Sequence, residues 1–338
     1  MGKKGILLVN LGTPDSPEVK DVKKYLDQFL MDGRVIDIPR FNRNLLVRGL
    51  IVPFRSPKTS KLYKEIWNEK GSPLLYYSKV QTAMLQEQLG DEYQVELAMR
   101  YQNPSIESAL ANLKTGLVES IRVIPLFPQY ASASTGSVIQ LIMELVGKWH
   151  TIPNISFVNS FHDNQLMIEV FAENARKHNP ESFDHVLFSF HGLPERQIDK
   201  SDYVAKSYNF RDVSQREDYN DGNKFCYLAQ SYHTAKLIAK ELNIDRKDYT
   251  VCFQSRLGKE PWVQPYTTDV LKRLAREGKK RLLVFSPAFV ADCLETLYEI
   301  TVEYHEEFRE LGGEHVQLVE SLNDHPKFVE ALVAMAKG

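Results

Sequence analysis

Short apolar runs rich in Val, Ile, Leu and Phe recur along this chain, and stretches of helical periodicity separate most of them. Runs of this kind are typical of parallel strands that are buried on both faces. Their alternation with helices predicts βαβ units, and therefore a doubly wound α/β fold with parallel sheets. The predicted strands are residues 5–9, 95–99, 121–127, 155–160, 186–190, 250–254, 282–286 and 316–319.

The length of 338 residues exceeds what one small core requires, so we expect two Rossmann-like halves with an active-site cleft between them. The segment Thr151-Ile152-Pro153-Asn154 is the expected boundary. The N-terminal half is then residues 1–153 and the C-terminal half is residues 154–321. A helix over residues 322–338 is expected to pack back on the N-terminal half.

Composition excludes several classes of protein. A formal net charge of -2 gives no overall attraction to nucleic acid. Cys226, Cys252 and Cys293 form no closely spaced pair, which excludes a disulfide framework and a cysteine-bound cluster. No apolar run approaches the ~20 residues that span a bilayer, and no signal peptide precedes the first strand. We therefore expect a cytoplasmic protein.

The predicted strand at 186–190 ends abruptly at His191, and Gly192-Leu193-Pro194 then interrupts regular structure. In open α/β sheets, ligands bind just beyond the carboxyl ends of the strands. Histidine is well suited to exchange protons or bind a metal near neutral pH. A single histidine at a strand end can equally be structural, so the other strand ends decide its meaning.

Carboxylates follow the predicted strand at 282–286. Asp292, Glu295 and Glu299 are spaced i, i+3, i+7, which places them on one face of a helix. One interpretation is structural, because Asp292 and Glu295 match a capping box and acids suit the first turn of a helix. The other is a ligand site, because this helix begins at the same sheet edge as His191.

Two more loops follow predicted strands. Residues 127–137 are rich in small hydroxyl side chains, which fit either an anion-binding turn or a helix cap. Residues 254–262 end at Trp262, which is either a core residue or an exposed aromatic wall. Neither a P-loop nor a dinucleotide-binding glycine pattern is present. A histidine, carboxylates and an aromatic loop suit a flat apolar ligand together with a cation better than hydride or phosphoryl transfer.

The chain resembles the ferrochelatase family, whose members insert ferrous iron into a porphyrin in haem synthesis. Similar motifs run through nearly the whole chain in the family's order. They are residues 8–14 (LVNLGTP), 71–74 (GSPL), 126–130 (LFPQY), 188–194 (FSFHGLP), 254–256 (QSR) and 294–297 (LETL).

The resemblance implies roles for particular residues. His191 and Glu295 match the pair at the family's metal-insertion site, and Glu299 matches the next acid along its metal or proton path. Tyr130 and Trp262 are implied to lie in or near the porphyrin site. Porphyrin and Fe²⁺ are substrates, so no cofactor is expected.

Three departures from the family pattern are informative. Cys293 stands where many members carry a histidine, and we do not expect it to be a metal ligand. Leu11 is at a substrate-binding position where the coproporphyrin-using branch typically has tyrosine, which favours the protoporphyrin-using branch. The chain ends shortly after Ala336, without the cysteine-bearing extension that holds an iron–sulfur cluster in some members.

Two segments do not fit the βα pattern. Residues 40–61 mix apolar and basic side chains, which predicts either peripheral contact with an anionic membrane or, as we favour, a lip over the substrate with arginines pairing to its propionates. The two can coexist. Residues 199–223 form a polar excursion to which we assign no function.

The expected activity is thus insertion of Fe²⁺ into protoporphyrin IX, with a haem acceptor as a transient partner. The alternatives are a coproporphyrin III ferrochelatase, a chelatase for another ring, and a non-catalytic module that binds a tetrapyrrole or metal. Sequence gives no oligomeric state.

Overall fold

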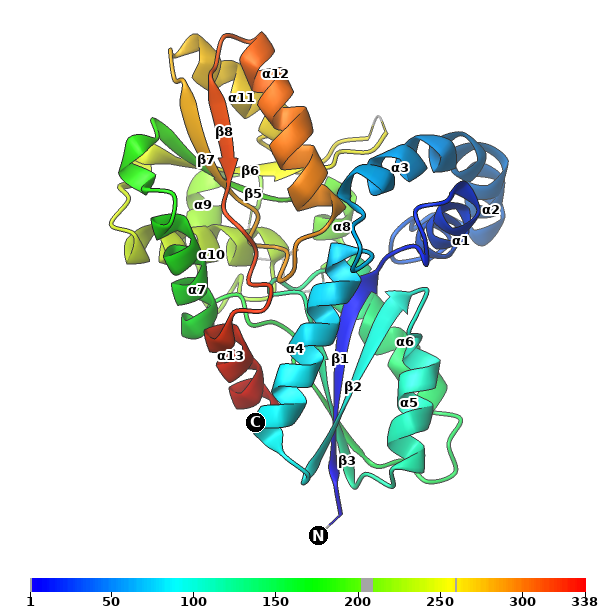
Figure 1. Cartoon of the computed structure of the whole chain (residues 1–338). Helices are drawn as coiled ribbons and strands as arrows, with labels where there is room; N and C mark the ends of the chain where they lie inside the picture. Colours follow the sequence, from blue (N-terminus) through cyan, green and yellow to red (C-terminus); the bar gives the residue numbers. More distant parts are fainter. Residues whose placement is uncertain (1, 202–208, 259) are drawn as a thin grey trace. The chain divides into compact units, whose positions relative to one another are not determined.

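The fold consists of two parallel four-stranded sheets with helices packed on them (Figure 1). The structure is a computed structural model that describes residues 2–201, 209–258 and 260–338. The strand orders are β2-β1-β3-β4 and β6-β5-β7-β8, and every strand pair is parallel. The predicted α/β class is therefore confirmed.

The chain groups into two compact units. Unit 1 comprises residues 1–127, 131–159 and 328–338, and unit 2 comprises residues 128–130 and 160–327. The division thus falls at 159/160, whereas the sequence suggests 153/154. The two boundaries differ because β4 pairs with β3 in the first sheet. β4 and the two residues after it therefore belong to unit 1 and not to unit 2.

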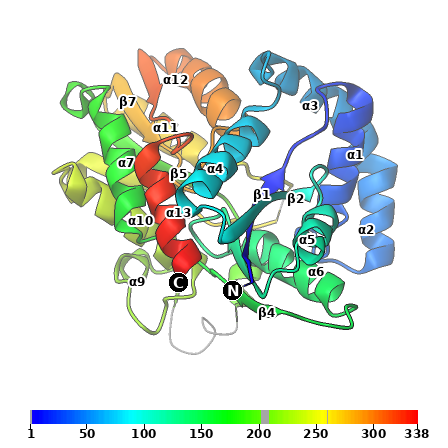
Figure 2. The same ribbon diagram turned by 60° about the horizontal axis from the view of Figure 1, so that its bottom comes forward.

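Unit 1 is built around β1, which lies between β2 and β3. Its apolar residues are buried on both faces, as the continuous apolar run predicts. Helix α4 lies on one side of the sheet, and α5 and α6 lie on the other (Figure 2). The strands are β1 (Lys4–Gly12), β2 (Tyr93–Tyr101), β3 (Ser120–Pro125) and β4 (Asn154–Phe157). The helices are α1 (Val19–Leu30), α2 (Arg40–Leu46), α3 (Val52–Ile66), α4 (Pro73–Leu89), α5 (Ile106–Thr115), α6 (Ser137–Val146) and α13 (Pro326–Lys337), whose last ten residues together with Gly338 belong to this unit as residues 328–338.

Unit 2 is built around β5, which lies between β6 and β7 and is buried at every position except His191. One core cluster joins this sheet to the helices that follow β6 and β7. The strands are β5 (His185–His191), β6 (Tyr249–Gln254), β7 (Arg281–Phe285) and β8 (His315–Leu318). The helices are α7 (Gln165–Arg176), α8 (Glu195–Asp199), α9 (Val213–Glu217), α10 (Tyr227–Glu241), α11 (Thr267–Arg276) and α12 (His305–Glu310).

Among the described residues, three segments are π-helices: η1 (Val47–Ile51), η2 (Ser132–Gly136) and η5 (Glu295–Tyr304). A π-helix usually spans a single turn and often occurs at a functional site. At ten residues, η5 is unusually long, and it carries both Glu295 and Glu299. The sequence predicts an ordinary helix here, so the π conformation is a finding of the structure.

In the described part of the chain, no helix has the length and apolar character that a bilayer crossing requires. Part of the polar excursion at 199–223, residues 202–208, lies outside the described residues. The remainder contains α9 and turns, and Tyr219 within it packs against two histidines.

Candidate functional site

The carboxyl edge of the unit 2 sheet brings three chain segments together. His191 ends β5 and is paired in register with Gln254, which ends β6. The amide of Gly192 donates to the Gln254 carbonyl oxygen at 2.8 Å. On the other side, the Ser286 hydroxyl just after β7 donates to the carbonyl of Ser189 at 3.1 Å. The parallel pairing therefore places the segments after β5, β6 and β7 at one edge.

His191 is held with one ring nitrogen available. Its Nδ1 lies 2.8 Å from the carbonyl oxygen of Gly192. Because a carbonyl only accepts, Nδ1 carries the hydrogen, and in the neutral ring Nε2 keeps its lone pair. The backbone is fixed as well, since the Tyr227 hydroxyl donates to the His191 carbonyl at 2.8 Å. Nε2 can thus accept a proton or bind a metal.

The loop after His191 needs glycine at position 192. A Cβ there would lie 2.8 Å from the carbonyl oxygen of Gln254 and 3.2 Å from a ring carbon of Trp262. Trp262 is buried, and its backbone pairs with Pro194. The indole therefore supports the loop from behind, which corresponds to the core interpretation of this residue.

Glu299 is the most firmly held acid of the site. Its carboxylate accepts from the Ser255 amide at 3.0 Å and the Ser255 hydroxyl at 2.7 Å. It also accepts from the Gln254 amide group at 3.2 Å and the Tyr304 hydroxyl at 2.8 Å. Burial and the Glu299 charge raise the pKa of Tyr304, so this hydroxyl stays a donor. Through Gln254, the strand neighbour of His191, Glu299 is linked to the histidine.

Glu295 is partly buried at the start of η5, next to Cys293. Burial raises the pKa of the Cys293 thiol well above its usual value, and the nearby Glu295 carboxylate acts in the same direction. The thiol is therefore protonated, whereas a cysteine that binds metal does so as the thiolate.

The sequence predicts that Asp292, Glu295 and Glu299 lie on one face of a helix, and the structure does not place Asp292 with the other two. This carboxylate is buried and accepts from the Thr296 hydroxyl at 3.1 Å and the Asn323 side chain at 2.7 Å. Asn323 follows β8, whereas Gln254 and Ser255, which donate to Glu299, lie at the end of β6, so the two acids bind different segments. Asp292 is not a capping-box residue either, since its described bonds go to these groups and to the amide of Ser321.

A different set of acids accompanies Glu299. A cavity of about 550 Å³ lies between the segments after β6 and the π-helix, and it is strongly acidic. Burial and the charges of neighbouring glutamates, Glu299 first among them, raise the pKa of Glu303. Such a concentration of carboxylates attracts cations. The acids lining the cavity are Asp269, Glu299, Glu303, Glu306, Glu307 and Glu310.

The remaining predicted residues are placed as follows. Leu11 lies near the carboxyl end of β1 and is partly buried. Tyr130 is also partly buried, and its backbone amide donates to the Gln230 side chain at 2.7 Å. Leu11 belongs to unit 1. The other predicted residues, Tyr130, His191, Trp262, Glu295 and Glu299, belong to unit 2.

Known proteins resemble this chain over almost its full length. Residues 3–338 match the family model described as Ferrochelatase. A ferrochelatase of Legionella pneumophila (strain Paris) is 45% identical over 330 residues, which cover 98% of this chain and 97% of that protein. A ferrochelatase of Coxiella burnetii (strain Dugway 5J108-111) is 42% identical over 339 residues, covering 99% and 93% respectively.

The fold also has a solved counterpart. SirB from Bacillus subtilis, whose structure was determined with Fe³⁺, matches with a TM-score of 0.54. The match covers 99% of this chain and 94% of that chain at 13% identity, so it supports the fold alone.

Proposed function

The chain belongs to the ferrochelatase family of metal-chelating lyases, and we propose that it inserts Fe²⁺ into protoporphyrin IX with release of two protons, as the final step of haem b synthesis. One observation carries the chemistry. His191, whose Nε2 can accept a proton, ends β5, and its strand neighbour Gln254 donates to Glu299, which lines an acidic cavity. A proton acceptor and a cation-attracting surface are the two functions that metal insertion requires.

His191 is proposed as the general base. Two pyrrole N–H protons must leave as the metal enters the ring, and a neutral imidazole accepts protons near physiological pH. The Gly192 carbonyl fixes the tautomer in which Nε2 is the acceptor. After protonation both ring nitrogens carry hydrogen, and Nδ1 keeps its bond to that carbonyl.

Glu295 and Glu299 are proposed to guide the cation. Carboxylate oxygen and imidazole nitrogen are both suitable ligands for ferrous iron. The acids of the cavity raise the local concentration of Fe²⁺, and the anchored Glu299 holds a fixed negative charge at its end. His191 and Glu295 then form the metal-insertion pair. Asp292 has no part in this route, because its buried carboxylate is bonded to Ser321 and Asn323 in the segment after β8 and does not line the cavity.

Protoporphyrin IX is proposed as the substrate because position 11 is leucine rather than tyrosine. Under anaerobic conditions with Fe²⁺ and catalytic amounts of enzyme, we expect protoporphyrin fluorescence to disappear over many turnovers. Coproporphyrin III, assayed in parallel, is expected to react at least about tenfold more slowly, which corresponds to 1.4 kcal/mol. Tyr130 and Trp262 are proposed to lie near the bound ring.

The outcomes of this assay separate the alternatives. Faster reaction of coproporphyrin III would assign the chain to the other branch. Quenching that stops at one porphyrin per protein, with no metalloporphyrin formed, would favour a binding module instead of an enzyme. Reaction with neither ring would refute the proposed activity.

We further propose that the enzyme is cytoplasmic and that residues 40–61 contact a membrane surface peripherally. Phe41, Leu45 and Phe54 in this segment are 81%, 69% and 71% exposed. Two arginines of the alternative lip are already engaged, since Arg48 forms a two-pronged pair with Asp27 and Arg43 donates to backbone carbonyls. At these two positions the guanidinium groups are therefore less available than the exposed apolar side chains, although Arg40 and Arg55 of the same segment are exposed as well. Haem would leave from here to a transient acceptor.

Liposome flotation tests the membrane contact. We expect the protein to float with vesicles of anionic lipid, because apolar burial and basic side chains act together. The double variant Phe41→Ser and Phe54→Ser should float markedly less. A matched variant, Leu117→Ser, removes an apolar side chain of similar exposure (82%) outside the segment and should float normally. If the unaltered protein does not float, the membrane contact is refuted, and the lip over the substrate is the remaining interpretation of residues 40–61.

A further inference from the structure

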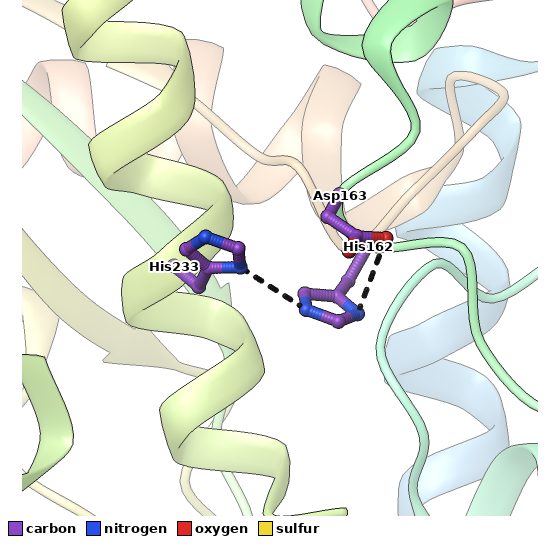
Figure 3. A group of neighbouring side chains, drawn as sticks. All are labelled: His162, Asp163 and His233. Carbon is purple, nitrogen blue, oxygen red and sulfur yellow. Dashed lines mark hydrogen bonds and ion pairs between the residues drawn. The ribbon is translucent and has the colours of Figure 1, made fainter. Parts of the chain in front are cut away.

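A second group of potential metal ligands lies in unit 2, apart from the residues proposed for insertion (Figure 3). His162 and Asp163 are adjacent in the segment between β4 and α7, and His233 lies on α10. The Nδ1 atom of His233 is 3.3 Å from the Nε2 atom of His162. One donor atom from each of the three residues can be chosen so that all lie within 4.8 Å of one another.

His162 is a buried histidine with one ring nitrogen that has no hydrogen-bond partner in the described structure. Its side chain is 3% exposed, and its Nδ1 atom is buried without a hydrogen bond in the described structure. The Asp163 oxygen nearest to it is 4.0 Å away, beyond hydrogen-bonding distance. Leaving a buried polar atom unpaired costs about 1–3 kcal/mol. This nitrogen is the one nearest Asp163, whereas the Nε2 atom on the other side of the same ring is the one that meets His233.

The surroundings hold both rings in place. The Thr234 hydroxyl donates to the His162 carbonyl oxygen at 2.7 Å. Tyr219 stacks on the ring of His233 with centroids 4.3 Å apart and planes 7° apart. The same tyrosine meets the ring of His162 edge-on at 5.0 Å. Tyr219 comes from the described part of the polar excursion at 199–223, and its ring covers the histidine pair.

The spacing of the two nitrogens fits a shared metal ion. For metal–nitrogen bonds of 2.0–2.1 Å in tetrahedral coordination, two ligand nitrogens lie about 3.3–3.4 Å apart. The observed distance of 3.3 Å agrees with this value. Asp163 is 53% exposed, so its side chain is free to move the short distance that a third ligand requires.

We propose that His162, Asp163 and His233 bind a divalent first-row transition metal ion such as Zn²⁺, Co²⁺ or Fe²⁺. Imidazole together with a single carboxylate suits these ions, whereas Mg²⁺ and Ca²⁺ require mostly oxygen ligands. Water completes the coordination on the exposed side of Asp163. The site is independent of the proposed insertion reaction, because it uses none of its residues.

Cobalt binding by the full chain tests this proposal. Protein stripped of metal with EDTA is dialysed against Co²⁺, and the bound metal is measured by elemental analysis together with the visible absorption of Co²⁺ bound to imidazole. We expect His233→Gln to bind one equivalent less than the unaltered protein. Asp163→Asn should weaken the binding of that equivalent at least about 10-fold, because it removes a proposed ligand, and loss even of a group that only supports a ligand typically costs about 10- to 100-fold.

Two controls make the result specific. His315→Gln alters another histidine pair of unit 2, whose rings are 5.4 Å apart, and should bind the normal number of ions. His191→Ala removes a proposed ligand of the insertion site. The double variant His191→Ala, His233→Gln should lose as many equivalents of bound Co²⁺ as the two single variants lose together. Additive losses distinguish the two sites, and a failed insertion assay would not affect this measurement.

The proposal is overturned if the unaltered protein and His233→Gln bind equal amounts of Co²⁺ with equal affinity. Equal melting temperatures in EDTA will show that the variant is folded. If His233→Gln does not fold, Asp163→Asn decides the question, because this exposed side chain makes no described contact that the fold needs. Unchanged Co²⁺ affinity in Asp163→Asn would then refute the site.

Discussion

Replacing His191 with alanine is expected to lower the rate of metal insertion by a factor of about 100 to 10,000, while the affinity for porphyrin stays nearly unchanged. General bases typically contribute this much to catalysis. The substitution removes the imidazole that we propose as the acceptor of the pyrrole protons, but leaves the backbone bonds from Gly192 and Tyr227 in place. Stopped-flow fluorescence measures insertion, and equilibrium quenching measures porphyrin binding.

A matched control lies at the other end of the same strand. His185 begins β5, is buried, and its Nε2 bonds to the Thr250 hydroxyl at 2.9 Å. His185→Gln should reduce stability but leave the rate of insertion within about threefold of normal, since remote side chains affect catalysis only indirectly. Substantial turnover by His191→Ala would remove this histidine from the mechanism.

The sheets could be predicted because their strands are buried on both faces. Residues 186–190, for example, form a continuous apolar run, and this run indicates a buried strand without any knowledge of which strands pair with it. All of the predicted strands are present, with ends displaced by only a few residues. What local signals do not give is the sheet to which a strand belongs. β4 looks like the beginning of the second half in sequence, yet its pairing with β3 places it in the first sheet.

The π-helix could not be predicted from the pattern of residues. Acids and apolar side chains at intervals of three and four positions are compatible with either an α-helix or a π-helix, which differ in their backbone bonding. The sequence therefore predicts correctly that Glu295 and Glu299 lie on a helix. It does not predict that this helix, η5, has the π conformation.

The contacts of the site depend on residues far apart in the chain. Asp292 and Glu295 satisfy the local pattern of a capping box, but Asn323 determines where the Asp292 carboxylate points. Likewise, the partners that fix Glu299 include Ser255, more than forty residues away. The third example is His162, whose Nε2 atom lies 3.3 Å from the Nδ1 atom of His233 on another element. Residue types can therefore suggest a site, whereas its internal bonding requires the fold.

Replacing Glu299 with glutamine is expected to lower kcat/KM for Fe²⁺ by about 10- to 100-fold, with little change in KM for porphyrin. Hydrogen bonds to a charged group typically contribute about 1.5–3 kcal/mol, and four donor contacts converge on this carboxylate. An amide removes the negative charge and directs its own N–H groups at some of these donors. Steady-state insertion rates measured against Fe²⁺ and against porphyrin separately will show which substrate is affected.

Two companion variants separate the anchored charge of Glu299 from the general acidity of the cavity. Glu303→Gln removes the next acid of the same cavity, which makes no hydrogen bond in the described structure. Because no donor fixes its carboxylate, we expect Glu303 to contribute only about 0–1 kcal/mol, which is at most about a fivefold effect. Tyr304→Phe keeps the charge but removes one of its donors, and should give an intermediate loss. If Glu303→Gln were as damaging as Glu299→Gln, the cation would respond to the summed charge of the cavity, and the fixed position of Glu299 would have no special importance.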